Sequence, residues 1–253
     1  MWAGKRLRHQ IFLLLNHCTY FLREKIDDEF ISNHENVSRE SADVLVRNGE
    51  TICGNGARDY ADLITYVNSH DLSKTSNYEY VCSLMDVESY ADFKIAQVYS
   101  ANIDLHNSKY YKTDEGDGKW RWIFYDQDFA FRDLNNSVAR TIMPGYNNVS
   151  HELIRALLKN KEFRNLYLSK FAYHLSNTFS DETVQNKIND IYNQIYTEME
   201  RNCQRWNLSF SSWKNNVESL KRTAVTRKKS ILKELKTVLN LSENEYNKYF
   251  KDI

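Results

Sequence analysis

The sequence predicts an α+β fold, with small sheet and hairpin elements ahead of a helix-rich C-terminal part. Chain breakers are rare, with seven Gly and one Pro among 253 residues, which disfavours turn-dense all-β folds. Aromatic segments typical of strands lie before residue 130, whereas long amphipathic repeats follow residue 150. Apolar residues make up 42% of the chain, which is enough for a core.

Charge and cysteine content narrow the function classes. Lys plus Arg and Asp plus Glu each number 34, so the net charge is zero, and nucleic-acid binding through bulk positive charge is not expected. The early apolar run at 11–15 is far shorter than the roughly 20 residues of a membrane span. No CxxC pair is present, so a structural zinc site is not indicated. The pairing of the four cysteines stays open: Cys18, Cys53, Cys82 and Cys203.

The first elements are short. Residues 10–15 and 19–23 are apolar around Asn16 and predict a hairpin. Residues 26–31 predict one or two helical turns, and the two acidic residues at 27 and 28 suit the start of a helix.

A longer polar region follows. We expect 33–55 to be irregular, because it is polar and ends in a glycine-rich loop. Apolar residues at helical spacing predict a helix over 59–68, and 69–77 is a polar break. Asp86 is a suitable N-cap for a helix over 87–100.

Two aromatic segments, 108–112 and 120–125, predict strands, and the turn-forming residues at 113–118 join them as a hairpin. Long helices are expected after residue 150. Ser242 with Glu245 matches a capping box for a short last helix. The helical stripes consist of Val184, Ile188, Ile191, Ile195 and Met199, and of Val217, Leu220, Ile231, Leu235 and Val238.

Polar residues flank the predicted 108–125 hairpin in the sequence, just before its first strand and just after its second. Asp104 and Asn107 precede its first strand, and Asp126 and Asp128 follow its second. In an antiparallel pair the start of one strand lies beside the end of the other, so three carboxylates and an amide should converge. Hard oxygen ligands of this kind suit Mg²⁺ or Mn²⁺, usually together with substrate phosphates.

The order helix, Asp, Asn, hairpin, Asp is also that of the protein-kinase catalytic and metal-binding loops. Here Asn107 follows Asp104 by three positions, whereas kinases place it five positions on. From the pattern alone, a hairpin whose acidic ends face solvent or bind calcium is an equal alternative. A calcium-stabilised helical protein, with Asp114 and Asp117 in the turn as ligands, is a third interpretation.

Three segments carry a resemblance to a known family. Residues 20–27 read YFLREKID, an Asn-x-Asp at 102–104 is followed by Asn107, and 122–128 read WIFYDQD. Together with Arg227 and the helical tail, they resemble the CotH kinase family, the atypical kinases associated with the spore coat. The resemblance runs from about residue 10 to residue 240.

The resemblance implies a protein-kinase-like fold that transfers the γ-phosphoryl group of ATP to Ser or Thr of a protein substrate, with Mg²⁺ or Mn²⁺. It also implies an association with the spore coat or the cell surface. Carried over by position, the implied roles are Asp104 as catalytic residue, Asn107 and Asp126 as metal ligands with Asp128 as a further one, Trp120 or Trp122 against adenine, and Glu24 in a hinge-like segment.

The same resemblance divides the chain. Residues 1–32 would be a remnant of the N-lobe with the hinge-like segment. Residues 33–253 would form a C-lobe-like domain, with the catalytic hairpin at 102–131 and a helical tail at 150–253.

Departures from the family pattern define an alternative function. The family has a basic region upstream of the first matched strand, and here only Lys5, Arg6 and Arg8 precede it. Tyr125 stands where the family has Trp. We therefore expect an N-terminally truncated member, and the alternative is a catalytically impaired pseudokinase or a CotH-like scaffold or binding protein.

Overall fold

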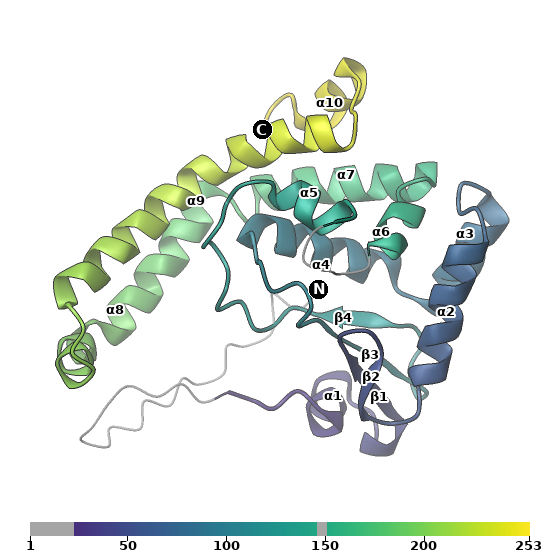
Figure 1. Cartoon of the computed structure of the whole chain (residues 1–253), viewed down its shortest axis with the longest axis horizontal. Helices are drawn as coiled ribbons and strands as arrows, with labels where there is room; N and C mark the ends of the chain where they lie inside the picture. The colour runs from purple at the N-terminus through teal and green to yellow at the C-terminus, as the bar shows by residue number, and fades with distance from the viewer. Residues whose placement is uncertain (1–22, 146–150) are drawn as a thin grey trace.

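The computed structural model describes residues 23–145 and 151–253. It has mixed α+β structure, as the sequence predicts, with one four-stranded antiparallel sheet and a larger set of helices (Figure 1). The hairpin expected at 10–23 lies almost entirely outside the described residues.

The sheet is built from two hairpins placed edge to edge. Its strands are β1 (Ala42–Val46), β2 (Glu50–Cys53), β3 (Lys109–Thr113) and β4 (Arg121–Ile123), in the order β2-β1-β3-β4. β1 and β3 pair over their whole length, from Ala42 opposite Thr113 to Val46 opposite Lys109. The first hairpin therefore supports the strand that follows the predicted catalytic loop.

The β1–β2 hairpin overturns the expectation that 33–55 is irregular. Val44 and Leu45 are both fully buried, on opposite faces of the sheet. The backbone N–H groups of Asn55 and Gly56 donate to the Asp43 carboxylate at 2.6 and 2.9 Å. The two strands are short, and they are stabilised by pairing with β3, a partner more than 50 residues away that no local pattern reveals.

The two faces of the sheet pack against different elements. On one side Tyr111 and Ile123 pack with Ile31 of helix α1 (Asp28–Glu35), which lies below the sheet in Figure 1. The predicted helix start is confirmed, because the Asp27 side chain accepts hydrogen bonds from the first turn. The other face packs against the helices and belongs to the main core.

Three helices follow the first hairpin: α2 (Ala57–Ser69), α3 (Thr75–Leu84) and α4 (Val87–Ser100). α2 and α4 confirm the predicted helices, and the Asp86 side chain caps α4 by accepting from Ser89 N–H at 2.9 Å. α3 begins at Thr75, so the end of the expected polar break is helical. The segment folds against the core because Tyr78 and Val81 are buried there.

The bounds of β3 differ from the predicted strand 108–112 by one residue at each end. The second strand, expected over 120–125, ends at Ile123. The chain leaves the sheet there, and it reaches a left-handed backbone conformation at Asp126, whose φ is 52°. The strand expected to run to Tyr125 is therefore shorter, and the residues after Ile123 form the site described below.

The remainder of the chain is helical: α5 (Ser137–Ile142), α6 (Glu152–Leu157), α7 (Lys161–Ser176), α8 (Asp181–Arg205), α9 (Phe210–Val238) and α10 (Glu243–Phe250). The Ser242 capping box of α10 is present as predicted. α8 and α9 form a long antiparallel pair that projects from the body of the molecule (Figure 1). Ile191 of the predicted α8 stripe is exposed, because α8 beyond the core contacts mainly α9.

Cys53, Cys82 and Cys203 are free thiols. Within the described ranges, no helix combines the length and apolarity that a bilayer crossing requires.

Candidate active site

The loop that carries Asp104 begins where α4 ends. Ala101 follows α4 with a left-handed φ of 50°, which turns the chain sharply. The buried Asn102 then accepts a hydrogen bond from the backbone N–H of Asp104 at 3.1 Å. This side chain-to-backbone turn fixes the direction in which the loop leaves the helix.

A buried arginine from the helical tail holds the same helix end. Arg227 of α9 is 1% exposed, and its guanidinium donates to the carbonyls of Val98 at 2.6 Å and Tyr99 at 3.0 Å. It also donates to the carbonyl of Leu134 at 3.1 Å and to the Ser137 hydroxyl. Carbonyls at a helix C-terminus lack intrahelical partners, so Arg227 satisfies the end of α4 and links it to α9.

The two ends of the β3–β4 hairpin meet, as the antiparallel arrangement predicts. The Asn107 side-chain amide donates a hydrogen bond to the Asp126 carboxylate. The Tyr125 hydroxyl donates to Asn107 Oδ1 at 2.6 Å. Asn107, Tyr125 and Asp126 are all partly buried, so this contact joins the residues before β3 to those after β4.

The Asp104 carboxylate lies near enough to Tyr125 to affect its pKa. Burial, together with the nearby carboxylates of Asp126 and Asp104, raises the pKa of Tyr125 to about 12. A phenol beside two carboxylates stays protonated and serves as a hydrogen-bond donor. Tyr125 therefore connects Asp104 electrostatically with the Asn107–Asp126 pair.

The loop after β4 is tied back to α4. The Ser100 hydroxyl donates to Gln127 Oε1 at 2.9 Å, and Gln127 Nε2 donates to the Tyr125 carbonyl at 2.7 Å. The Phe131 N–H donates to the Ser100 carbonyl at 2.8 Å. Sequence reasoning gave no role to Gln127, since a glutamine between two aspartates has no distinctive pattern.

The carboxylates do not converge as tightly as expected. Asp128 is exposed, and across 23–145 and 151–253 no three His, Cys, Asp or Glu side chains form a metal-binding group. What the hairpin end offers is one carboxylate and one amide in contact, with Asp104 nearby. The Asp126 carboxylate is a hard oxygen donor that fits Mg²⁺ or Mn²⁺, since Mg²⁺ is commonly held by one or two protein ligands plus waters and phosphate oxygens. Asn107 turns its amide nitrogen toward Asp126 and its oxygen toward Tyr125, so the amide has to turn over to become the second oxygen ligand.

The other predicted residues lie elsewhere. Trp120 is 2% exposed and packs edge-on against Tyr60 and Tyr110, so it is a core residue of the hairpin. Trp122 packs against Tyr90 of α4, on the helical face of the sheet. Glu24 is exposed and pairs with His34 at 2.9 Å.

One cation lies close to the hairpin end. Lys109, the first residue of β3, places its ammonium 5.0 Å from the centre of the Tyr125 ring and donates to the Ile26 carbonyl at 3.1 Å. Desolvation lowers its pKa, while the carboxylates of Asp27 and Asp126 act in the opposite direction. Lys25, by contrast, is exposed and pairs with Asp27 at 3.0 Å.

The turn aspartates considered as calcium ligands have protein partners. The Asp117 carboxylate accepts two hydrogen bonds of 2.7 Å from Arg121, which lower its pKa to about 2. Asp114 lies 3.9 Å from the Lys112 ammonium. Because both carboxylates are next to cations of the chain itself, the calcium interpretation gains no support.

Comparison with known families decides the relationship. The family description "CotH kinase protein" matches residues 18–231. The chain belongs to the CotH kinase family. The match covers α1 through most of α9 and includes the Asp104 loop, the β3–β4 hairpin and Arg227, so the resemblance inferred from the sequence is confirmed. No curated protein matches the chain. A kinase-like fold is compatible with this membership and with the observed α+β structure.

Proposed function

We propose that this CotH-family chain is an atypical protein kinase that transfers the γ-phosphoryl group of ATP to a Ser or Thr of a protein substrate. The observation that carries the proposal is the contact between Asn107 and Asp126, with Asp104 acting on the same tyrosine. Family membership suggests the reaction class, and the contact suggests where on this chain the reaction takes place.

Each residue has a distinct role in the proposal. Asp104 orients the acceptor hydroxyl and accepts its proton, as the catalytic-loop Asp does in kinases. Asn107 and Asp126 would hold the divalent ion. The Tyr125 hydroxyl donates to Asn107 Oδ1 at 2.6 Å, so in the proposal the Asn107 amide turns its oxygen from Tyr125 toward the ion when the ion binds. Asp128 is exposed, and its proposed role is limited to an outer contact with the ion's waters.

Bound at these residues, Mg²⁺ or Mn²⁺ would neutralise the charge on the transferred phosphoryl group. This chain contributes oxygen donors from two loops that the antiparallel hairpin keeps together. Lys109 is the described cation best placed to contact a phosphate beside Asp126, because its ammonium lies over Tyr125.

An adenine site on the hairpin tryptophans has less support. Trp120 is enclosed by core aromatics, and Trp122 packs on α4. We therefore keep ATP as the proposed donor without assigning its base to either side chain.

The test is transfer of labelled γ-phosphate to the chain itself and to a mixed protein substrate, in the presence of Mg²⁺ or Mn²⁺. Asp104→Asn should reduce transfer by at least ~100-fold, the usual scale for loss of a proton-transfer group. Asp126→Asn should also reduce it strongly, because the ion would lose its carboxylate ligand. Asp114→Asn, in the exposed turn of the same hairpin, is the matched control and should leave transfer unchanged. Retained transfer in both site variants, with unchanged melting curves, would refute the assignment.

A second function is favoured by one observation. The Asn107 amide nitrogen faces the Asp126 carboxylate, so this pair is satisfied without a cation. A pseudokinase that acts as a scaffold or binding protein is consistent with that arrangement. Thermal shift separates the two: ATP with Mg²⁺ stabilises a competent site by mass action, whereas no shift at millimolar ATP favours the scaffold.

A further inference from the structure

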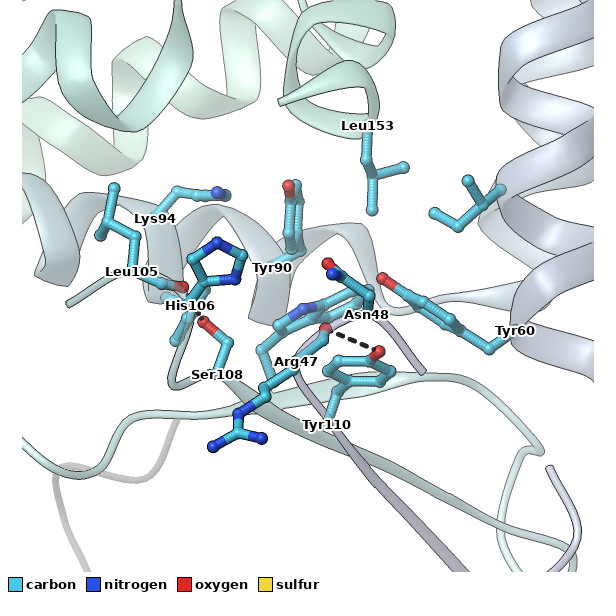
Figure 2. A pocket seen from close by; sticks show the side chains of 13 residues that line it. Arg47, Asn48, Tyr60, Tyr90, Lys94, Leu105, His106, Ser108, Tyr110 and Leu153 are labelled. Atoms are coloured by element: carbon cyan, nitrogen blue, oxygen red, sulfur yellow. Dashed lines mark hydrogen bonds between the residues drawn. The ribbon is translucent and has the colours of Figure 1, made fainter. Parts of the chain in front are cut away.

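A cavity of about 400 Å³ lies between α4, the helical face of the sheet and α2. Asp104, Asn107 and Asp126 are not among its lining residues, so it is separate from the proposed phosphoryl-transfer site. The cavity nevertheless borders the loop that carries Asp104, because Leu105, His106 and Ser108 form part of its wall (Figure 2). Its volume lies within the range of small-molecule pockets.

The cavity wall contains a buried lysine, Lys94 of α4, and this side chain indicates that the cavity binds a ligand. The Lys94 side chain is 8% exposed and points into the cavity toward Tyr90, with the ammonium 5.5 Å from the centre of that ring (Figure 2). Among the residues that the structure describes, no carboxylate pairs with it and no side chain or carbonyl accepts a hydrogen bond from it. A buried ammonium without such a partner is costly.

The described charged side chains that line the cavity around Lys94 are all basic. The cavity lining contains Arg47, Lys94 and His106 but no Asp or Glu from the described part of the chain. Arg47 turns its guanidinium away from the cavity in Figure 2 and pairs with Glu50 at 3.2 Å. Burial alone lowers the pKa of Lys94, to about 8. At neutral pH the amine is therefore still mostly protonated. Its positive charge points into the cavity, whereas that of Arg47 points away (Figure 2).

Aromatic rings form much of the remaining wall, beside the polar side chains of Asn48 and Ser108. Tyr60 and Tyr110 lie with ring centres 4.2 Å apart, and Tyr90 and Trp122 with centres 4.5 Å apart. Trp122, one of the two tryptophans that the family resemblance suggests for adenine, forms part of the wall of this cavity. Aromatic walls of this kind favour a planar apolar group.

We propose that this cavity binds a small ligand in which an anionic group, carboxylate or phosphate, is joined to a flat apolar body. The anion pairs with the Lys94 ammonium, and the flat body lies among Tyr60, Tyr90 and Trp122. The proposal goes beyond phosphoryl transfer and is independent of it. Because His106 lies between Asp104 and Asn107, a ligand in the cavity would contact the loop that carries the proposed catalytic residue.

The experiment is calorimetric titration of the full chain with four probes: indole-3-carboxylate, its neutral analogue indole-3-carboxamide, phenyl phosphate and phenol. We expect saturable binding of at least one anionic probe, at least tenfold tighter than its neutral analogue. The carboxylate and phosphate arms distinguish the two anions. Lys94→Met, which keeps the side-chain length, should abolish the preference, and Lys229→Met on the exposed face of α9 should preserve it.

A pH series on the unaltered chain covers the case in which Lys94→Met folds poorly. The titratable groups that line the cavity are Lys94, His106, three tyrosines and Arg47, whose guanidinium points away from it. Burial raises the pKa of Tyr60, Tyr90 and Tyr110. Affinity for the anionic probe should therefore fall as pH rises through about 8, and this fall should persist in His106→Gln.

Three results would overturn the proposal. The first is the absence of saturable binding of both anionic probes at millimolar concentration. The second is equal affinity for an anionic probe and its neutral analogue. The third is binding that Lys94→Met leaves unchanged. None of them bears on phosphoryl transfer, which is measured separately.

Discussion

The Asn107 amide donates a hydrogen bond to the Asp126 carboxylate across 19 positions of sequence. The β3–β4 hairpin makes this contact possible, because it brings the loop after α4 beside the loop after β4. The Tyr125 hydroxyl, which donates to Asn107, completes the arrangement. The proposed function and the first prediction depend on this contact.

Replacing Asn107 with Asp should make the stability of the chain depend on divalent metal. Two adjacent carboxylates repel one another unless a cation lies between them. We expect a lower melting temperature for Asn107→Asp in chelator, and a larger Mg²⁺-induced rise than in the unaltered chain, by differential scanning fluorimetry. Asn193→Asp on the exposed face of α8 is the control. Equal Mg²⁺ responses in all three proteins would count against a cation at this position.

Removing the Arg227 guanidinium should destabilise the chain strongly. Arg227→Met leaves the carbonyls of Tyr99 and Leu134 without this donor, while the Val98 carbonyl keeps the Ala101 N–H at 3.2 Å. Unsatisfied buried polar groups cost about 1–3 kcal/mol each. We expect the free energy of unfolding in urea to fall by about 3 kcal/mol or more. Arg222→Met, exposed on the same helix, should change it little. A loss of less than about 0.5 kcal/mol for Arg227→Met would contradict the role assigned to it.

Lys94→Met should stabilise the chain in a pH-dependent way. Burial lowers the pKa of Lys94 to about 8 in the folded state, whereas an unfolded lysine has a pKa of about 10.4. Between these values the unfolded chain binds more protons, so the stability of the unaltered chain rises with pH. The advantage of Lys94→Met should therefore be largest below pH 8, on the order of 2–3 kcal/mol, and shrink toward a pH of about 10.4.

Urea unfolding of both proteins at several pH values checks this prediction. The difference between them isolates Lys94, because tyrosine and cysteine titrations are common to both chains. A difference that does not vary from pH 6 to pH 10 would show that Lys94 is solvated or paired, and it would also weaken the anion site.

The Asp117–Arg121 pair should contribute stability that is lost in acid. Hydrogen bonds from Arg121 lower the pKa of Asp117 to about 2, so the contribution is present above the unfolded pKa of about 3.9 and disappears as pH falls toward 2. Because the Asp117 side chain is 45% exposed, solvent screening limits it to less than about 1 kcal/mol. Asp117→Asn should lose less stability than the unaltered chain between pH 5 and pH 2. Identical acid titrations of unfolding would contradict the pair.

The sequence is informative where local chemistry decides the structure. Asp86 and Ser242 predict helix starts because their side chains cap the backbone directly after them. The meeting of Asn107 and Asp126 follows from hairpin geometry, since the turn between the strands is easily recognised. For the same reason the family resemblance could be recognised from the residues around these loops.

Interactions between distant segments are not predictable in this way. β1 forms because it pairs with β3, and Arg227 contacts carbonyls 128 and 129 positions away. Lys94 looks like an ordinary surface lysine of α4 until α2, α6 and the sheet enclose it. Trp120 looks like a platform for a base, but the packing of the hairpin against the helices buries it. In each case the deciding partner is absent from the local sequence.

The central claim, that the two ends of the β3–β4 hairpin hold a divalent ion together with ATP, is tested most directly by electron paramagnetic resonance of Mn²⁺. Mn²⁺ is titrated into the full chain with a non-hydrolysable ATP analogue, and free ion is measured. The account predicts saturable Mn²⁺ binding that Asn107→Ala and Asp126→Asn each weaken at least tenfold and Asp114→Asn leaves intact. Equal Mn²⁺ binding by all four proteins, or none by the unaltered chain, would contradict it.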